Sequence, residues 1–307
     1  MMILAFDFGG TKLTAGCVPT AVSPQTWHTH QRIFSPAGAD AQYDIDTMIR
    51  LGHEMLAGAK PAAVGVSFGG PVDFARGMVR LSHHVPGWEE TPLQTIFEDE
   101  FDAPVRVDND ANVAALGEFA FGAGCGLCDL MYLTVSTGVG GGWILNGRPW
   151  RGHEGMAGEI GHTAVDPNGP LCLCGKRGCV ERLASGPYMA ADYVEEGGEA
   201  RGERGEITGK RVAELAAAGD EVARRILRRG AWGLGVGIGN AANLLNPQRF
   251  VLGGGVTKAG EMWWTAVRAA AQQTALPEIH FDIVPAQLGD DAPLWGAVAL
   301  AGTIGIE

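Results

Sequence analysis

The sequence predicts an α/β protein with two lobes. A chain of 307 residues is long enough for two packed lobes, and an apolar content of 46% is ordinary for a globular protein. A strand, a glycine turn and a second strand occupy Met2–Val18, and the same plan returns at Leu130–Leu145. Segments with helical spacing of apolar residues follow each copy. The internal repeat thus separates the elements into two series, one for each lobe.

The first series opens with a buried strand at Met2–Phe8, which Gly9 and Gly10 interrupt before a returning strand at Thr11–Val18. The elements expected next are a strand at Trp27–Phe34, a helix at Ala41–Ala57, a strand at Ala63–Phe68, a helix at Pro92–Phe101 and a short strand at Val105–Val107. A helix over Asn109–Phe121 completes the series, with Asp108 as its expected N-cap.

The second series begins with a strand at Leu130–Val135, a turn at Gly138–Gly142 and a strand at Gly142–Leu145. The remaining elements expected are helices at Pro187–Glu196, Ala218–Leu245 and Gly260–Thr274, a strand at Val251–Gly255 and a charged surface loop at Gly197–Gly209. An apolar helix over Asp291–Gly302 is expected to dock back on the first lobe. The predicted domains are therefore residues 1–116 with 291–307, and residues 117–290.

Charge and composition exclude several classes of partner. A formal charge of −12 disfavours nucleic acid and anionic membranes as partners. No apolar run approaches the roughly 20 residues that span a bilayer. The first residues run straight into Asp7 and do not resemble a secretory signal, so we expect a cytoplasmic protein with reduced thiols.

Four soft ligands lie within eighteen residues, in the spacing His-x9-Cys-x-Cys-x4-Cys. They are His162, Cys172, Cys174 and Cys179. Zinc prefers a closed tetrahedral set of this kind, and the glycines between the thiols allow the chain to turn back on itself. Glu159 and Glu181 flank the ligands, so a metal here would hold two carboxylates beside an imidazole.

Buried structural thiols and disulfides are the alternative interpretations of these cysteines. Three thiols within eight residues and separated by glycine argue against ordinary core cysteines, and the absence of a signal argues against disulfides. Cys17 lies in an apolar strand and is expected in the core. Cys125 and Cys128 have no second pair or nearby histidine, so we interpret them as loop thiols.

Three glycine clusters each follow an apolar strand, at residues 7–12, 136–142 and 252–256. Glycine lets backbone N–H groups approach a phosphate closely. Asp7 ends a strand and is suited to Mg²⁺, usually through water, while Thr11 or Lys12 is suited to contact a phosphate oxygen. A single cluster is more often a hairpin turn, but three together favour phosphate binding. None matches a P-loop or a dinucleotide-binding fingerprint.

Asp108, Asn109 and Asp110 stand in sequence between a strand and a helix. One such residue suffices to cap a helix, which stabilises it by about 1 kcal/mol. The surplus suggests chemistry, namely a carboxylate that accepts a proton from a hydroxyl as its oxygen attacks phosphorus.

These motifs together resemble the ROK family of sugar kinases and sugar-responsive repressors, and the similarity runs in order over essentially the whole chain. The motifs are Asp7-x-Gly-Gly-Thr-Lys12, Asp108-Asn-Asp-Ala-Asn112, Thr137-Gly-x-Gly-Gly-Gly142, Gly158-Glu-Ile-Gly-His162 and the cysteine module that ends at Glu181. The resemblance implies a two-lobed actin-like (ribonuclease H-like) ATPase fold, each lobe a mixed sheet with flanking helices.

The resemblance also implies roles for individual residues. Asp110 would be the general base for the sugar hydroxyl, and the sugar would be bound by Gly70, Asn109, Glu159, His162 and Glu181. ATP would be held by Asp7, Gly9, Gly10, Thr11, Lys12, Thr137, Gly138 and Gly140, with adenosine near Gly253, Gly254 and Gly255. The zinc would be structural, and the imidazole of His162 would keep one nitrogen for a sugar hydroxyl.

The sequence departs from the family pattern at two places. Gly69 stands where proline is usual, in the turn Phe68-Gly69-Gly70-Pro71. His84 stands where asparagine is frequent, ahead of Pro86-Gly87-Trp88. This second segment lies near the sugar in relatives, so it bears on the choice of hexose, although His83 and His84 fit a solvated loop equally well.

The leading hypothesis is an ATP- and Mg²⁺-dependent kinase that phosphorylates the 6-hydroxyl of a hexose, glucose first of all. N-acetylmannosamine, N-acetylglucosamine, fructose and allose are the alternative acceptors. A repressor of the same family would carry an N-terminal DNA-binding domain, and no basic helix precedes Met2 in this sequence. A third hypothesis is a sugar- or zinc-binding module without catalysis. We expect a homodimer or higher homo-oligomer, and no nucleic acid or membrane as partner.

Overall fold

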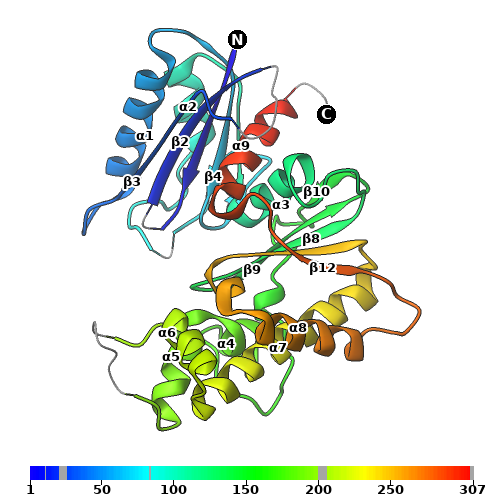
Figure 1. The fold of residues 1–307 in the computed structure, drawn as a ribbon. Helices are drawn as coiled ribbons and strands as arrows, with labels where there is room; N and C mark the ends of the chain where they lie inside the picture. Colours follow the sequence, from blue (N-terminus) through cyan, green and yellow to red (C-terminus); the bar gives the residue numbers. More distant parts are fainter. Residues whose placement is uncertain (11, 21–25, 83, 200–205, 305–307) are drawn as a thin grey trace. The chain divides into compact units, whose positions relative to one another are not determined.

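The structure is a computed structural model that describes residues 1–10, 12–20, 26–82, 84–199 and 206–304. The chain forms two compact units, both of mixed α/β architecture (Figure 1). Unit 1 comprises Met1–Cys128, Gly142–Ala157 and Ala286–Glu307, and unit 2 comprises Asp129–Gly141 and Gly158–Pro285. The domain boundaries derived from the sequence, after residues 116 and 290, stay a prediction.

The sheet of unit 1 has the strand order β3-β2-β1-β4-β7. Its strands are β1 (Met2–Phe8), β2 (Lys12–Pro19), β3 (Thr29–Phe34), β4 (Pro61–Phe68) and β7 (Val105–Asn109). β1, β2 and β3 are antiparallel, whereas β1, β4 and β7 are parallel to one another. Parallel neighbours end at the same edge of a sheet, so the loops after β1, β4 and β7 lie side by side.

Two sets of helices cover the two faces of this sheet. The helices of unit 1 are α1 (Ala41–Leu56), α2 (Leu93–Phe101), α3 (Asp110–Phe121) and α9 (Ala292–Gly302). α1 and α2 enclose a core that includes Phe6, Phe8 and Phe97, whose rings pack edge to face or tilted. On the other face α9 contacts β1 and β4 (Figure 1). Gly65 is required there, because any Cβ would overlap the carbonyl of Ala297.

The second sheet has the order β10-β9-β8-β11-β12. Its strands are β8 (Leu130–Val135), β9 (Val139–Leu145), β10 (Arg148–Trp150), β11 (Arg249–Gly253) and β12 (Asp282–Pro285). β11 is parallel to both β8 and β12. The strand expected at 142–145 in fact begins at Val139, because the turn is completed by Gly138, whose carbonyl accepts a hydrogen bond from the Ser136 N–H at 2.9 Å. A short hairpin, β5 (Val72–Asp73) and β6 (Met78–Val79), lies in unit 1.

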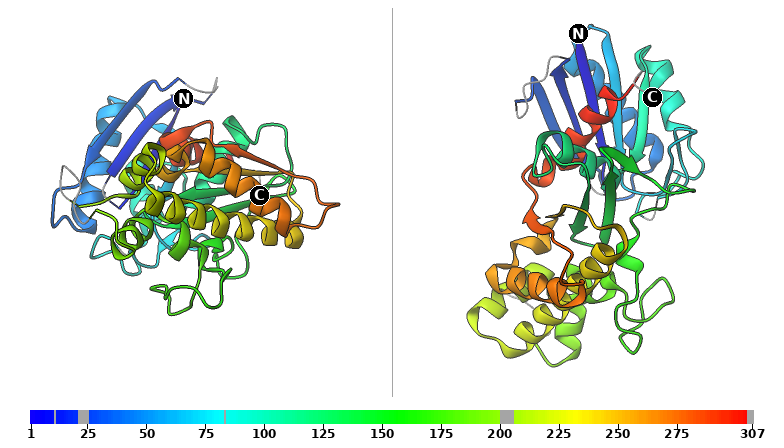
Figure 2. Two further views of the ribbon diagram at one scale, coloured as in Figure 1. Left: turned by 60° about the horizontal axis from the view of Figure 1, so that its bottom comes forward. Right: turned by 90° about the vertical axis from the view of Figure 1, so that its right-hand side faces the viewer.

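The helices of unit 2 are α4 (Val180–Ala184), α5 (Gly186–Glu195), α6 (Gly209–Ala218), α7 (Glu221–Leu245) and α8 (Glu261–Thr274). Short 3-10 turns are η1 (Ile160–His162), η2 (Gly255–Ala259) and, in unit 1, η3 (Gly289–Asp291). α7 and α8 run side by side (Figure 2), with Gly235 against the backbone of Val267. The helix expected from Ala218 begins only at Glu221. Gly219 ends α6 at a φ of 107°, and the Asp220 carboxylate caps α7 by accepting from the Ala223 N–H.

The expected N-cap of α3 is also wrong. Asn109, not Asp108, caps this helix, and its side-chain oxygen accepts from the Ala111 N–H at 3.0 Å. β7 continues through Asn109, so Asp108 still belongs to the strand, and its carboxylate points into the protein. Strand pairing with β4, which a single segment of sequence does not reveal, decides this placement.

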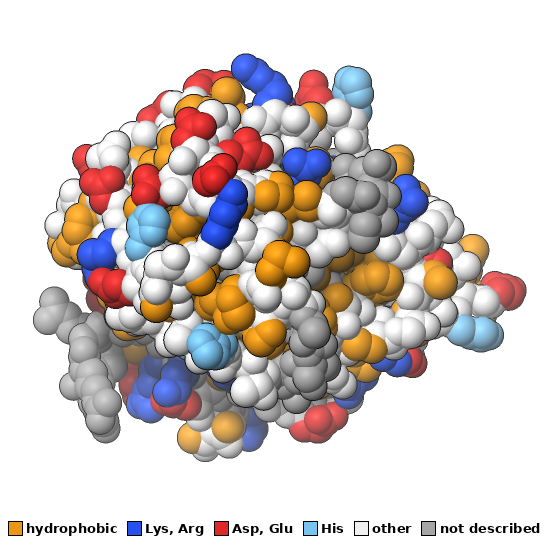
Figure 3. All heavy atoms as spheres, turned by 90° about the horizontal axis from the view of Figure 1, so that it is seen from above, with side chains coloured by type: hydrophobic (Ala, Val, Ile, Leu, Met, Phe, Trp, Pro, Cys, Tyr) orange, Lys and Arg blue, Asp and Glu red, His pale blue; other side chains and the backbone are white. Residues whose placement is uncertain are grey.

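None of the described helices is long and apolar enough to cross a membrane. Acidic side chains gather on part of the face drawn in Figure 3, with basic side chains interspersed. This distribution agrees with the formal charge of −12.

Candidate functional site

In unit 1, three loops meet where the parallel strands β1, β4 and β7 end. The Gly69 N–H donates to the Phe8 carbonyl at 2.8 Å, which joins the loops after β4 and β1. The Asn109 amide donates to the Gly70 carbonyl at 3.0 Å, which joins the loops after β7 and β4. These two bonds bring the predicted residues Asp7, Gly70, Asn109 and Asp110 to one edge of the sheet.

Asp110 is the first residue of α3 and is partly exposed. Its Oδ1 accepts from the Ala111 N–H at 2.8 Å and from the Asn109 amide at 3.0 Å. Because Oδ1 is held by two donors, the orientation of the carboxylate is fixed by its own loop. A carboxylate fixed in this way at a helix N-terminus is already oriented to accept a proton, so it does not need to change its conformation first.

Asp7 is a half-buried residue of β1 and lies opposite Ser67 of the neighbouring strand β4. The Ser67 hydroxyl donates to its Oδ1 at 2.8 Å. Desolvation by burial, together with the nearby charge of Asp110, raises the pKa of Asp7 to about 7. A divalent cation would offset both costs, so the two carboxylates and this degree of burial fit the predicted Mg²⁺ site.

Replacement of Asp7 by asparagine should stabilise the protein at alkaline pH. The pKa of this carboxyl is higher in the folded than in the unfolded chain, so the native stability falls as pH rises from about 4 to 7. Asp7→Asn removes this loss, and we expect a gain of ~1–3 kcal/mol in the free energy of unfolding at pH 8 without added Mg²⁺, and less at pH 5.

Urea unfolding at the two pH values measures this difference, with Asp99→Asn, a change at an exposed position of α2, as the control. Loss of stability at pH 8 in Asp7→Asn would contradict the predicted sign.

The first glycine turn connects β1 to β2. The Gly9 N–H donates to the Lys12 carbonyl at 2.9 Å, and the side chain of Lys12 is exposed. The imidazole of His84 lies against Gly10, where a Cβ would come within 2.9 Å of the ring. His84 therefore borders the predicted phosphate turn. Thr11 and His83, two residues that the sequence singled out, lie outside the described residues.

Sequence reasoning missed Arg151, which holds the loop that carries Asn109 and Asp110. Its Nε donates to Asp108 Oδ2 at 2.7 Å, and both side chains are largely buried. The guanidinium also lies 3.5 Å from the ring centroid of Phe74. The surplus of acids in the Asp108-Asn-Asp110 run was a signal for this ion pair, but its partner, 43 residues away, was not visible in the sequence.

In unit 2, the second glycine turn is connected directly to a predicted sugar ligand. Glu181, on α4, accepts from the Val139 N–H through Oε2 at 2.9 Å. A Cβ on residue 138 would come within 2.7 Å of the same oxygen, so Gly138 permits this close approach. One carboxylate therefore supports the turn that contains Thr137, Gly138 and Gly140.

A cavity of about 950 Å³ opens beside this turn. Its walls include Thr137, the start of α5 at Gly186, Pro187 and Met189, and the start of η2 at Gly255. Gly253 and Gly254 directly precede Gly255 in the chain and allow β11 to approach β8 closely. A Cβ on Gly253 would overlap Tyr132, and a Cβ on Gly254 would overlap Val135. The size and apolar walls suit a purine nucleoside. Pro187 and Met189 are lining residues that the sequence did not single out.

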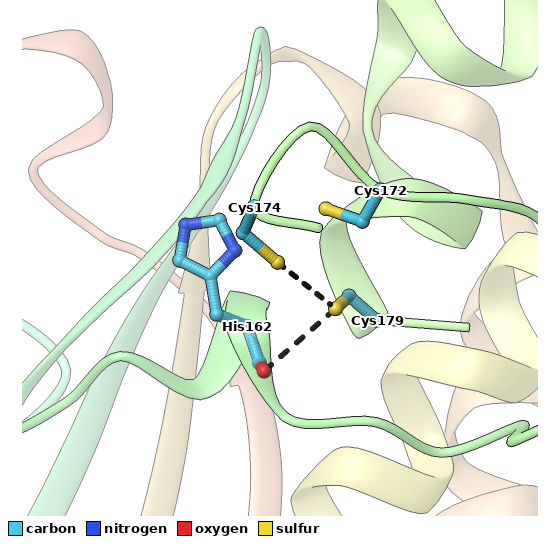
Figure 4. A group of neighbouring side chains, drawn as sticks. All are labelled: His162, Cys172, Cys174 and Cys179. Atoms are coloured by element: carbon cyan, nitrogen blue, oxygen red, sulfur yellow. Dashed lines mark hydrogen bonds between the residues drawn. The ribbon is translucent and has the colours of Figure 1, made fainter. Parts of the chain in front are cut away.

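The predicted zinc ligands converge on one point. One ligand atom from each of His162, Cys172, Cys174 and Cys179 lies within 4.8 Å of every other, and Figure 4 shows an imidazole nitrogen and the sulfurs facing a common centre. Cys174 and Cys179 approach to 3.5 Å between sulfurs. Among the described residues this is the only such group of three or more His, Cys, Asp or Glu side chains.

The chemistry of these four residues fits zinc. Nδ1 of His162 is buried and has no hydrogen-bond partner in the described part of the chain, a costly condition that a metal would relieve. The Lys176 N–H lowers the pKa of the Cys174 thiol, whereas burial raises that of Cys179. A bound cation would deprotonate the buried thiol as well. The other three cysteines lie where the sequence predicted them. Cys17 is buried, and Cys125 and Cys128 are exposed.

Glu159 differs from the other predicted sugar ligands of unit 2. It is exposed and directly precedes η1, which carries His162. The chain therefore presents the carboxylate to solvent three residues before the imidazole.

The two mixed sheets and their flanking helices define the class of this protein, which is one with an actin-like ATPase fold. The sequence matches the profile of the ROK family over residues 3–304. The chain is 39% identical to a glucokinase of Halalkalibacterium halodurans, over 78% of this chain and 76% of that protein. It is 33% identical to an N-acetylmannosamine kinase of Shigella flexneri, over 98% of both chains.

A crystal structure of a ROK-family glucokinase from Streptomyces griseus, in complex with glucose and AMPPNP, superimposes with a TM-score of 0.78. The two sequences are 34% identical, and the alignment covers 99% of this chain and all of that one. This chain belongs to the ROK family.

Proposed function

We propose that this ROK-family enzyme, an ATP-dependent sugar kinase, phosphorylates glucose at its 6-hydroxyl with Asp110 as the general base. The observation that carries the proposal is the position of Asp110 at the same sheet edge as Asp7 and the Gly9–Lys12 turn. A base, a carboxylate suited to a cation and a phosphate turn are the parts that a phosphoryl transfer to a hydroxyl requires. The glucokinase relatives support glucose as the acceptor.

In this proposal, residues of the chain position the reactants and supply the charged groups of the reaction. Asp110 accepts the proton of the hydroxyl as its oxygen attacks the γ-phosphorus, and Asn109 with Gly70 fixes the loop that carries Asp110. Mg²⁺, when bound near Asp7, would neutralise the charge on the phosphates. The turns at Gly9–Lys12 and Thr137–Gly140 would hold the phosphates through backbone N–H groups, and adenosine would occupy the cavity beside Gly255.

Unit 2 would supply the remaining sugar ligands. Zinc held by His162 and the three cysteines would orient the imidazole, leaving Nε2 for a sugar hydroxyl. Glu159 and Glu181 are the proposed carboxylate partners of other hydroxyls. Because Glu181 also accepts from Val139, its second oxygen is the one proposed for the sugar.

A panel of sugars tests this function. ADP release with ATP and Mg²⁺ should be fastest with glucose among glucose, mannose, fructose, allose, N-acetylglucosamine and N-acetylmannosamine. A preference for N-acetylmannosamine would instead favour the alternative that the Shigella flexneri relative supports. No turnover of any sugar by zinc-loaded, folded protein would refute the kinase assignment and favour a non-catalytic sugar-binding protein. A homodimer or higher oligomer, a cytoplasmic location and the absence of nucleic acid or membrane partners stay predictions.

A further inference from the structure

Two side chains, Arg182 on α4 and Tyr188 on α5, contact the backbone of the loop that carries the thiols. The Tyr188 hydroxyl accepts from the Leu173 N–H, between Cys172 and Cys174, at 3.2 Å. The Arg182 Nε donates to the Leu171 carbonyl at 3.1 Å. Both contacts reach the backbone of the loop Leu171–Cys179, here called the metal loop, immediately beside the proposed zinc ligands.

The side chains of Arg182 and Tyr188 also contact each other. The Arg182 guanidinium lies 4.6 Å from the ring centroid of Tyr188. It forms a bidentate pair with Asp192 of α5, with distances of 2.7 and 2.9 Å, and only 12% and 6% of the two side chains are exposed. Arg229 of α7 donates to the same carboxylate and, at 2.8 Å, to Glu196. A bidentate pair with this little exposure fixes its partners firmly.

The contacts of Arg182 and Tyr188 connect two parts of the proposed site, the metal loop and the cavity proposed for the nucleoside. Arg182 follows Glu181 on α4, and Cys179 occupies the N-cap position of the same helix. Tyr188 stands on α5 between Pro187 and Met189, which line the nucleoside cavity. Helix α5 therefore lines the cavity with Pro187 and Met189, and contacts the metal loop with Tyr188 between them.

We propose that Arg182 and Tyr188 are positioning residues, a clamp that holds the loop Leu171–Cys179 in the geometry that retains zinc and presents His162 and Glu181 to the sugar. The clamp acts through the loop backbone and touches neither sugar nor nucleotide. This inference rests on the proposed zinc site and kinase activity. It assigns a function to an ion-pair network that would otherwise only stabilise the packing of α4, α5 and α7.

Tyr188→Phe isolates the clamp, because it removes one hydrogen bond and keeps the ring against Arg182. With a chromophoric chelator in excess, we expect zinc release to be about three- to ten-fold faster than in the wild type, as befits the loss of one hydrogen bond. The KM for glucose should rise by a similar factor, while the KM for ATP changes less than about two-fold. Arg182→Lys, which loses the bidentate fork, should show the same pattern with a larger effect.

Tyr193→Phe is the matched control. Tyr193 stands on the same helix, and its hydroxyl donates at 3.1 Å to Asp220, away from the metal loop. Its zinc release should equal that of the wild type. Unchanged release in Tyr188→Phe, equal acceleration in both variants, or wild-type protein that retains no zinc would each overturn the clamp. If the wild type binds zinc but phosphorylates no sugar, the kinase proposal fails, and the release rates still decide the clamp.

Discussion

Asp110→Asn should retain its fold and its ligands and lose turnover by about 10²- to 10⁴-fold, the usual contribution of a general base. Asparagine can still accept from the Ala111 N–H through Oδ1, so the start of α3 should keep its geometry. It cannot accept a proton from the sugar hydroxyl at neutral pH. The loss should therefore appear in kcat, with the KM for glucose and for ATP changed only a few-fold.

Steady-state kinetics with glucose and ATP measures this effect, and thermal unfolding checks the fold. Asp40→Asn is a matched control, because Asp40 is another helix-terminal carboxylate of unit 1 that accepts from a backbone N–H, that of Tyr43. Its turnover should equal that of the wild type. Turnover of Asp110→Asn close to the wild-type value would remove Asp110 from the role of base and leave it as a helix-terminal acid.

The sequence predicted the elements whose signals are local. β1 and β8 occupy the predicted residues, because an apolar run bounded by glycine or a turn determines both ends of a strand. The long helix was predicted to begin at Ala218, and the shorter helix α6 before it was not predicted. Gly219 ends α6 and Asp220 caps α7, so α7 begins only at Glu221.

The candidate site shows the same division. The thiols and His162 lie within eighteen residues, so their spacing in the sequence already indicated a common ligand, and the structure brings their ligand atoms together. Asp108 was assigned as a cap because its neighbours in sequence suggested one. Its actual partner, Arg151, is brought to it only by the tertiary fold. The contacts of Arg182 and Tyr188 with the metal loop depend on helix packing in the same way, and so do the walls of the cavity. No local pattern in the sequence predicts either of them.

Cys174→Ser should lose zinc and, with it, most of the affinity for glucose, while ATP binding is largely kept. Serine is a poor zinc ligand, and three remaining ligands hold the ion much less tightly than a closed set of four. Without the ion, nothing in the described chain holds Nδ1 of His162, and the loop carrying Cys172–Cys179 loses the centre on which it converges. The cavity proposed for the nucleoside has walls from α5, α6 and η2, which do not contain the proposed metal ligands.

Zinc content by elemental analysis and calorimetric titration with glucose and with AMPPNP measure these changes. We expect glucose affinity to fall by at least about ten-fold, and AMPPNP affinity by no more than about two-fold. Cys125→Ser is the matched control, because this exposed thiol donates to the Ala120 carbonyl at 3.4 Å, away from the cluster. Zinc binding by thiolates competes with protons, so wild-type protein should also lose zinc, and glucose affinity with it, as pH falls. Equal loss of both ligands in Cys174→Ser, with a lower melting temperature, would mean that the ion supports the fold of all of unit 2 rather than the sugar site alone.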